Sequence, residues 1–224
     1  MMAWCRSSIG KKILMAASGL LLLGFVITHL LGNLLIFAGP DALNDYAHHL
    51  RELGPLLWLA RIFLLIAVAV HVVTSIQVTR ENRAARPQPY RLTRSRETTL
   101  AARTMMLSGL LVLAYVIYHL LHFTFRVTNP NLSHAIDRFG HPNVYAMVVR
   151  SFQIPAVSLA YILGMTAVWF HLIHGIGSAF QTLGLNNKRT LAALQVGGRV
   201  LASLLYLGYV SIPLAVLFGV VTLR

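Results

Sequence analysis

Four histidines lie inside long apolar stretches of the sequence, one in each of the first four such stretches. They are His29, His71, His119 and His171. An ionisable side chain in the middle of a membrane-length helix is costly, so it indicates a functional role. A single histidine of this kind is as often a packing residue that bonds a neighbouring helix. One histidine on each of four successive helices favours chemistry over packing.

The depth of each histidine in its helix separates the four into two pairs. At the rise of an α-helix, His29 and His119 lie roughly 24 Å above the inner ends of their spans, and His71 and His171 about 13 to 15 Å. We therefore expect an outer pair, His29 with His119, and an inner pair, His71 with His171, about 10 Å apart in height. Two neutral imidazoles on facing helices can hold one haem iron from both sides, and haem fills a helix-bundle core well. Double ligation leaves no open coordination position, which favours electron transfer.

Two further histidines, His122 and His174, follow one helical turn after His119 and His171. They lie nearer the membrane surfaces, where a haem propionate or a quinone head group would bind. Packing by hydrogen bonds is an equally good interpretation of both. A metal-ion transporter would more often combine histidine with Asp, Glu or Cys inside its spans, and these spans contain no acid.

The composition is that of a polytopic helical membrane protein. Of 224 residues, 57% are hydrophobic and 11% are charged, and the apolar runs reach the roughly 20 residues that cross a bilayer. We expect an all-α membrane protein of one domain over residues 1–224, with a short outer amphipathic helix at 41–53. Residues 143–152 form either a second interfacial turn or the start of helix four, and we expect no internal repeat. The expected spans are at about 13–37, 56–79, 103–125, 154–181 and 196–221.

The net charge of +13 would suggest nucleic-acid binding in a soluble protein. In a membrane protein, basic residues mark cytoplasmic loops, so we expect no nucleic-acid partner, a cytoplasmic N-terminus and an outer C-terminus. Cys5 is the only cysteine, which excludes an internal disulfide and any iron–sulfur or zinc site built from thiolates. The first apolar run is long enough to span and ends in no signal-peptide cleavage site, so we expect it to stay in the mature protein.

The chain resembles the cytochrome b membrane anchor of succinate dehydrogenase and fumarate reductase, in the form with a single five-helix subunit and two b haems. The resemblance covers the whole chain: five spans, an inner N-terminus and histidines on helices one to four. The local matches are Ser18-Gly19 ahead of His29 and the runs at 28–30, 44–48, 69–71, 118–120 and 170–175.

The resemblance implies that His29 and His119 are axial ligands of one b-type haem, and His71 and His171 of a second. It implies partners: a flavoprotein subunit with covalent FAD that oxidises succinate, and an iron–sulfur subunit that carries the electrons. This chain, with no dehydrogenase chemistry of its own, would pass the electrons to a membrane quinone, menaquinone being usual for this form. The expected setting is respiratory complex II, an enzyme of the tricarboxylic acid cycle, in a bacterial cytoplasmic membrane.

The quinone site and the haem propionates have weaker candidates. A basic inner face that includes Lys11, Lys12 and Arg103 would dock the iron–sulfur subunit, or it reflects only the charge bias of cytoplasmic loops. The candidates on the outer side are His48, His49, Glu52 and His122, and those on the inner side are Ser18, Arg103 and His174.

Two other interpretations stay open. The first alternative is the cytochrome b subunit of a formate dehydrogenase or a hydrogenase. Such a subunit would differ in its number of helices and in the helices that supply ligands. The second alternative is a haem-free transporter or scaffold that uses its histidines for packing or proton relay. The direction of the reaction and any higher oligomer of the complex are also open.

Overall fold

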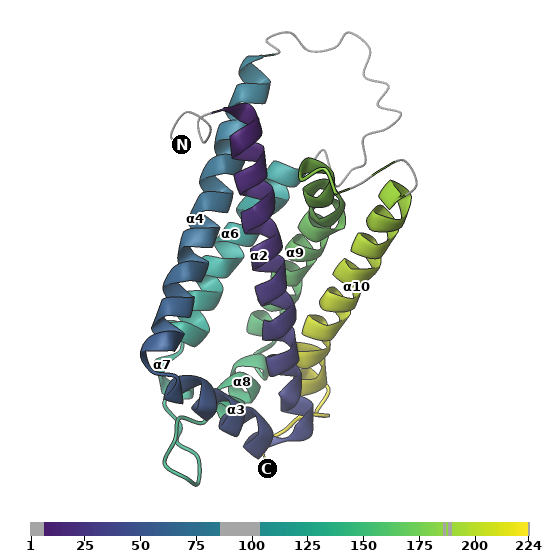
Figure 1. Cartoon of the computed structure of the whole chain (residues 1–224). Helices are drawn as coiled ribbons and strands as arrows, with labels where there is room; N and C mark the ends of the chain where they lie inside the picture. Colours follow the sequence, from purple (N-terminus) through teal and green to yellow (C-terminus); the bar gives the residue numbers. More distant parts are fainter. Residues whose placement is uncertain (1–6, 86–103, 186, 188–189, 224) are drawn as a thin grey trace.

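The computed structural model describes residues 7–85, 104–185, 187 and 190–223. In this part of the chain, five helices are long and apolar enough to cross a membrane, which confirms the all-α membrane fold. They run along a common direction in Figure 1. They are α2 (Ser8–Leu34), α4 (Pro55–Ala84), α6 (Met105–His119), which a π-helical segment continues to Thr124, α9 (Pro155–Thr182) and α10 (Thr190–Leu217).

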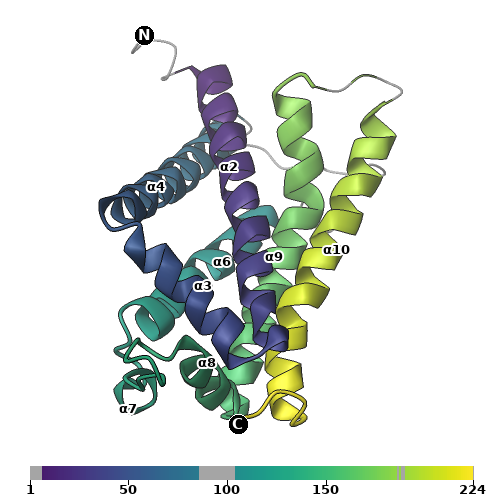
Figure 2. The same cartoon turned by 60° about the horizontal axis from the view of Figure 1, so that its bottom comes forward.

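The first four spans form a four-helix bundle. Helix α2 packs on α4, α6 packs on α9, and α2 also contacts α9. Helix α10 lies outside this bundle and covers α9 and part of α2. Consequently α2 and α6 lie across the bundle from one another, and so do α4 and α9 (Figure 2).

Three short helices close one end of the bundle. They are α3 (Pro40–Glu52), α7 (Pro130–Ser133) and α8 (Val144–Phe152), and they lie where α2 ends and α4 begins (Figures 1 and 2). We call this the cap end, and the opposite end, where α2 begins, the N-terminal end. The predicted helix at 41–53 is confirmed as α3.

Residues 143–152 form a separate helix and not the start of helix four. Ile154 has extended backbone (φ −85°, ψ 112°) and divides α8 from α9. The proline that follows it, Pro155, disfavours helical backbone at the residue before it and then starts α9 at its first position.

Two asparagines join α3 to α8 in the cap. The side chain of Asn143 caps α8 by accepting a hydrogen bond from Ala146 N (2.8 Å). Asn44 on α3 donates from Nδ2 to Asn143 Oδ1 (3.2 Å), and its own Oδ1 accepts from Tyr145 N (3.0 Å). Because these polar groups are paired inside a buried apolar cluster, the cap is a fixed part of the fold.

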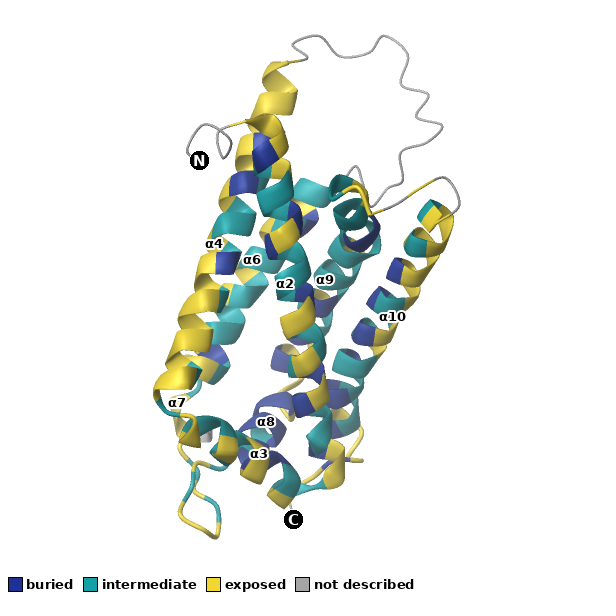
Figure 3. Ribbon diagram, in the orientation of Figure 1, coloured by how far each residue is buried: buried dark blue, intermediate teal, exposed yellow. Residues whose placement is uncertain are grey.

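The outward faces of the spans are apolar and exposed, as a lipid environment requires. Figure 3 shows α4 exposed along most of its visible face. The exposed large apolar side chains of α4 include Leu56, Trp58, Leu59, Ile62, Phe63, Leu65 and Ile66.

The fifth span begins earlier and ends earlier than the predicted 196–221. Helix α10 starts at Thr190 and stops at Leu217. It stops because Gly219 adopts a positive φ of 70°, while Val220 N and Val221 N both bond the carbonyl of Ala215. A glycine in the left-handed region is a common helix terminator.

Candidate functional site

Two pairs of histidine rings face one another across the bundle. His29 on α2 and His119 on α6 have ring centroids 5.9 Å apart, with their planes at 83°. His71 on α4 and His171 on α9 have ring centroids 6.1 Å apart, with their planes at 75°. The structure thus brings together the same partners that helix depth predicts. We call them the cap-end pair and the N-terminal-end pair.

The spacing within each pair fits one metal ion between two imidazoles. A metal–nitrogen bond of about 2 Å puts the ring centroid about 3 Å from the metal, so two opposed rings have centroids about 6 Å apart. Both ring planes contain the nitrogen–metal–nitrogen axis and can take any angle to one another, so 83° and 75° also fit.

Two histidine side chains meet at each of these places. Within the described parts of the chain, no group of three or more His, Cys, Asp or Glu side chains is arranged to hold a metal ion. A bare metal ion usually takes three or four protein ligands, whereas a porphyrin brings its own four nitrogens and needs only the axial positions filled. The residues present therefore fit two haems with histidine on both faces.

The ring of His71 is fixed through its second nitrogen. His71 Nδ1 lies 3.0 Å from the carbonyl oxygen of Met15 and 3.4 Å from Ser18 Oγ. A carbonyl oxygen can only accept, so Nδ1 carries the proton and Nε2 keeps the lone pair that binds a metal. The Ser18 hydroxyl donates to the carbonyl of Leu14 (2.7 Å), which leaves the Ser18 oxygen able to accept from the ring.

His171 has the same surroundings, supplied by α6. Ser108 Oγ lies 3.3 Å from His171 Nδ1. The Ser108 hydroxyl donates to the Met105 carbonyl (3.1 Å), so its oxygen also accepts from Nδ1–H. Ligating histidines commonly donate their other N–H to such an acceptor.

Two glycines leave room for these rings. A Cβ atom at Gly19 would lie 3.0 Å from His71 Cε1, and one at Gly109 would lie 3.3 Å from His171 Cε1. Both distances are tighter than ordinary contacts. Any larger residue would therefore displace the ring that it faces.

Ser108 and Gly109 were not predicted as site residues, although an internal repeat in the sequence would have found them. Residues 15–31 align without a gap with residues 105–121, and Met, Ser, Gly and His recur at equivalent positions. Residues 55–76 align in the same way with 155–176: each helix begins with proline and carries its histidine at the same place. The expectation of no internal repeat is wrong, since α2–α4 and α6–α9 are related helix hairpins.

The repeat extends into the cap. The pattern Asn44-x-Tyr46-Ala47 in α3 recurs as Asn143-x-Tyr145-Ala146 at α8, and each is followed at the same distance by an arginine. Each histidine pair therefore takes one histidine from each half, at equivalent positions. This relationship explains why two ligands of a pair lie at matching depth.

The two pairs lie about 16 Å apart along the helices. This follows because Ser18 is level with the His71 ring and precedes His29 on α2 by three helical turns, and Ser108 has the same relation to His171 and His119. The expected separation of about 10 Å was too small. That expectation placed the predicted inner ends of the spans at one level, whereas the contact between Ser18 and the His71 ring sets the height of α4 relative to α2.

Aromatic rings surround the cap-end pair. Phe25 stacks on His29 with centroids 5.2 Å apart, and Tyr209 of α10 lies 6.3 Å from the same ring. The Tyr209 hydroxyl donates to the carbonyl of Val26 (2.7 Å), which ties α10 to α2 at this level. His119 Nδ1 is buried without a hydrogen-bond partner among the residues described. Such an unpaired atom is uncommon in the buried part of a protein.

His122 is a packing residue in this structure. Its side chain is 2% exposed, with Nδ1 3.0 Å from the Tyr161 hydroxyl and Nε2 3.2 Å from Ser151 Oγ. It lies in the π-helical segment that directly follows His119. Since both ring nitrogens already have protein partners, His122 has no nitrogen available for a metal. His174 is half-buried one turn beyond His171 on α9.

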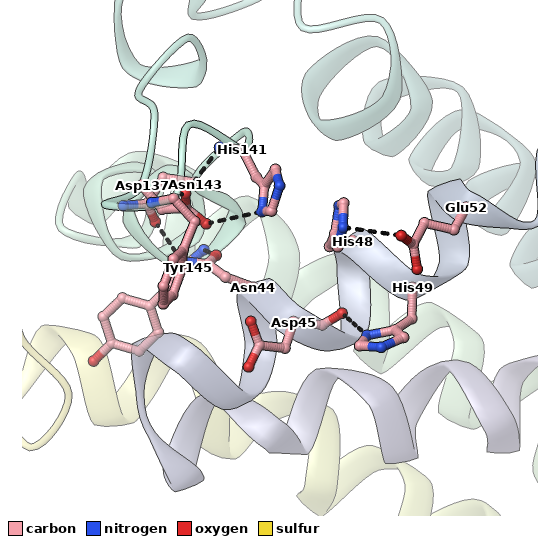
Figure 4. A network of polar contacts seen from close by, with 10 residues as sticks. Asn44, Asp45, His48, His49, Glu52, Asp137, His141, Asn143 and Tyr145 are labelled. Carbon is pink, nitrogen blue, oxygen red and sulfur yellow. Dashed lines mark hydrogen bonds and ion pairs between the residues drawn. The ribbon is translucent and has the colours of Figure 1, made fainter.

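The predicted candidates on α3 lie in a polar cluster at the cap (Figure 4). The ring of His48 stacks on His141 with centroids 3.7 Å apart and planes at 12°, and His48 Nε2 is 3.2 Å from Glu52 Oε1. His49 bonds its own helix through Nδ1 to the Asp45 carbonyl (2.7 Å). Sequence reasoning missed His141, because only the fold brings its loop onto α3.

Asp137 organises the loop that carries His141. Its Oδ1 accepts from Phe139 N (2.9 Å) and His141 N (2.8 Å). Burial raises the pKa of Asp137, but these backbone N–H groups and the neighbouring His141 and His48 lower the pKa by more, so the net shift is downward.

Of the predicted candidates at the N-terminal end, the structure describes all but Arg103. Ser18 is buried, and its hydroxyl oxygen lies beside the Nδ1 atom of His71, as described above. Lys11 forms an ion pair with Glu81 of α4, and Lys12 is exposed. Arg103 lies outside the described residues.

No family model matches the chain, and neither a curated protein nor a solved structure matches it. The functional argument therefore rests on the residues and their geometry.

Proposed function

We propose that this chain is a dihaem cytochrome b that anchors a succinate:quinone oxidoreductase in a bacterial cytoplasmic membrane. It would relay electrons between an iron–sulfur subunit and a membrane quinone, menaquinone in particular. The flavoprotein and iron–sulfur subunits of respiratory complex II would dock at the N-terminal end on the cytoplasmic side, and the cap end would face outward.

The observation that carries the proposal is the presence of two opposed histidine pairs, with centroids 5.9 and 6.1 Å apart, at two levels of one bundle. Two b-type haems bound there would supply one-electron centres at both levels. The chain would hold each iron with one imidazole from each half. Because both axial positions are taken by protein, the site favours electron transfer over oxygen binding.

The chain's own residues prepare the pairs for this role. Met15, Ser18 and Ser108 orient the rings of the N-terminal-end pair, as shown above. Aromatic rings pack against the cap-end pair: Phe25 and Tyr209 both lie beside His29. The protein thus supplies placement and surroundings, and the bound groups carry the electrons.

The succinate assignment draws on the order of features along the chain. The count of five spans, the histidines on helices one to four and the Asn-Asp-Tyr-Ala-His run at 44–48 resemble the anchors of succinate dehydrogenase and fumarate reductase. The exposed basic residue Lys12 at the N-terminal end suits a negatively charged partner surface, whereas Lys11 is already paired with Glu81.

The test is to express the chain in its source membrane with an affinity tag and purify it in mild detergent. We expect a flavoprotein and an iron–sulfur protein to co-purify, and succinate to reduce the b haems in the absence of other donors. Reduction of the haems by formate or hydrogen, together with different co-purifying proteins, would identify the chain as the anchor of a formate dehydrogenase or a hydrogenase instead. A folded complex with no haem would contradict the dihaem proposal itself.

A further inference from the structure

We propose that Ser18-Gly19 and Ser108-Gly109 are positioning residues for one haem only, that of the N-terminal-end pair. They would fix which ring nitrogen of His71 and His171 meets the iron, and they would make these two ligands more basic. This inference rests on the proposed haem ligation and adds a specific asymmetry between the two haems.

The same small structure is built twice, once in each half of the repeat. In each half the first helix presents a serine hydroxyl and the adjacent glycine to the histidine of the second helix. In the first half the Met15 carbonyl is a further acceptor, 3.0 Å from His71 Nδ1. The serine hydroxyl proton is directed to a backbone carbonyl in both halves, so only the oxygen lone pair faces the ring. Both halves of the repeat keep this arrangement, so it is a shared feature of the two hairpins.

The cap-end pair has no such arrangement. His119 Nδ1 is buried without a partner among the described residues, and the neighbours of His29 are the rings of Phe25 and Tyr209. The two pairs therefore differ in the hydrogen bonding of their ligands, although their ring spacing is nearly the same.

The difference has an electronic consequence. An imidazole that donates its Nδ1 proton to an oxygen acceptor is a more basic ligand. A more basic ligand stabilises the ferric state, which lowers the reduction potential. Removal of the serine acceptor should therefore raise the potential of one haem and leave the other unchanged.

The first experiment uses Ser18→Ala, Ser108→Ala and the double variant in the purified complex, with spectroscopic redox titration and low-temperature electron paramagnetic resonance. We expect an upward shift in the midpoint potential of one haem, the same haem in both single variants, with a larger shift in the double variant. Ser75→Ala is the matched control, because the Ser75 hydroxyl bonds the His71 backbone carbonyl (2.6 Å) and not its ring. Shifts in different haems, or no shift in the double variant, would overturn the inference while leaving two haems in place.

The second experiment tests the space for the rings. Gly19→Ala and Gly109→Ala should change the low-spin resonance of that same haem or lower its occupancy, because a Cβ would press on His71 or His171. Gly24→Ala on α2 is the control, since no atom lies within 4 Å of its added Cβ. Equal effects from Gly19→Ala and Gly24→Ala would contradict the positioning role.

A third readout does not depend on haem. In the wild-type chain prepared without haem, solid-state nitrogen NMR should find the ring proton of His71 and His171 on Nδ1, which fits the Met15 carbonyl acceptor. A proton on Nε2 in both rings would overturn the inference. If the chain never binds haem but its rings carry the proton on Nδ1, the proposed function is refuted and the ring orientation by these residues still stands.

Discussion

The ring of His29 on α2 faces the ring of His119 on α6 with centroids 5.9 Å apart, although α2 packs chiefly on α4 and α9. The two histidines occupy equivalent positions in the two halves of the chain, and His71 and His171 repeat the relationship nearer the N-terminal end of the bundle. A pseudo-symmetric pair of helix hairpins thus creates two places where opposed imidazoles can share one metal.

Removal of one ligand should remove one haem. His29→Ala and His119→Ala should each lose the haem of the cap-end pair and keep the other, because the two pairs share no residue. Haem content per chain, measured as the pyridine adduct, should fall by half. Thr28→Ala, which removes an exposed hydroxyl beside His29 that bonds only backbone carbonyls, should keep both haems. Loss of the same haem from His29→Ala and His71→Ala would break the proposed pairing.

His122 should matter for stability and not for haem content. His122→Ala would leave the buried Tyr161 and Ser151 hydroxyls without their partner, at a cost of about 1–3 kcal/mol. Thermal unfolding in detergent should show a lower midpoint, whereas both haems stay bound with unchanged resonances. His49→Ala, at an exposed position on α3, is the control. A changed haem signal in His122→Ala would mean that His122 is a ligand after all.

Gly164 should tolerate no side chain. A Cβ at this position on α9 would overlap the ring of Tyr115, a neighbour of His119. Gly164→Ala should destabilise the chain by about 1–3 kcal/mol through overpacking. Gly197→Ala on α10, where the added atom meets nothing within 4 Å, should be neutral or slightly stabilising because alanine favours helix. A comparable melting temperature for both variants would refute this packing argument.

The loop at residues 134–143 should become less stable in acid. Because the pKa of Asp137 is lowered in the folded chain, its carboxylate stabilises the loop above its ordinary pKa of 3.8, and this stabilisation disappears as the pH falls through the folded value. Hydrogen exchange of residues 134–143, corrected for the intrinsic pH dependence, should rise below about pH 4 in the wild type. The pH dependence should be absent in Asp137→Asn and retained in Asp45→Asn. Persistence of the acid transition in Asp137→Asn would assign it to another group.

Much of the fold and the pairing of the four histidines could be predicted from the sequence. Long apolar runs allow few structures in a membrane, and the depth of a histidine in a helix follows directly from its distance to the helix end. The α3 helix was also predictable, because its apolar residues recur at helical spacing between two spans.

Other features depend on information that local patterns do not carry. The repeat is hard to recognise because apolar residues substitute for one another freely on lipid-facing surfaces, so the pattern is kept mainly by a few positions, among them the equivalent Ser, Gly, His and Pro residues. The stacking of His141 on His48 depends on the fold of the cap, which brings a distant loop onto α3. The roles of Ser18 and Ser108 depend on which helix lies beside each histidine, and helix length alone does not determine this.

The most direct test of the central claim is the haem content and axial ligation of the purified complex. A reduced-minus-oxidised spectrum with haem quantification should give two b haems per chain, and electron paramagnetic resonance should give two low-spin ferric signals, each lost with one histidine pair. A complex shown to be folded and associated with its partners, yet free of haem, would contradict the account and return the histidines to packing or proton transfer.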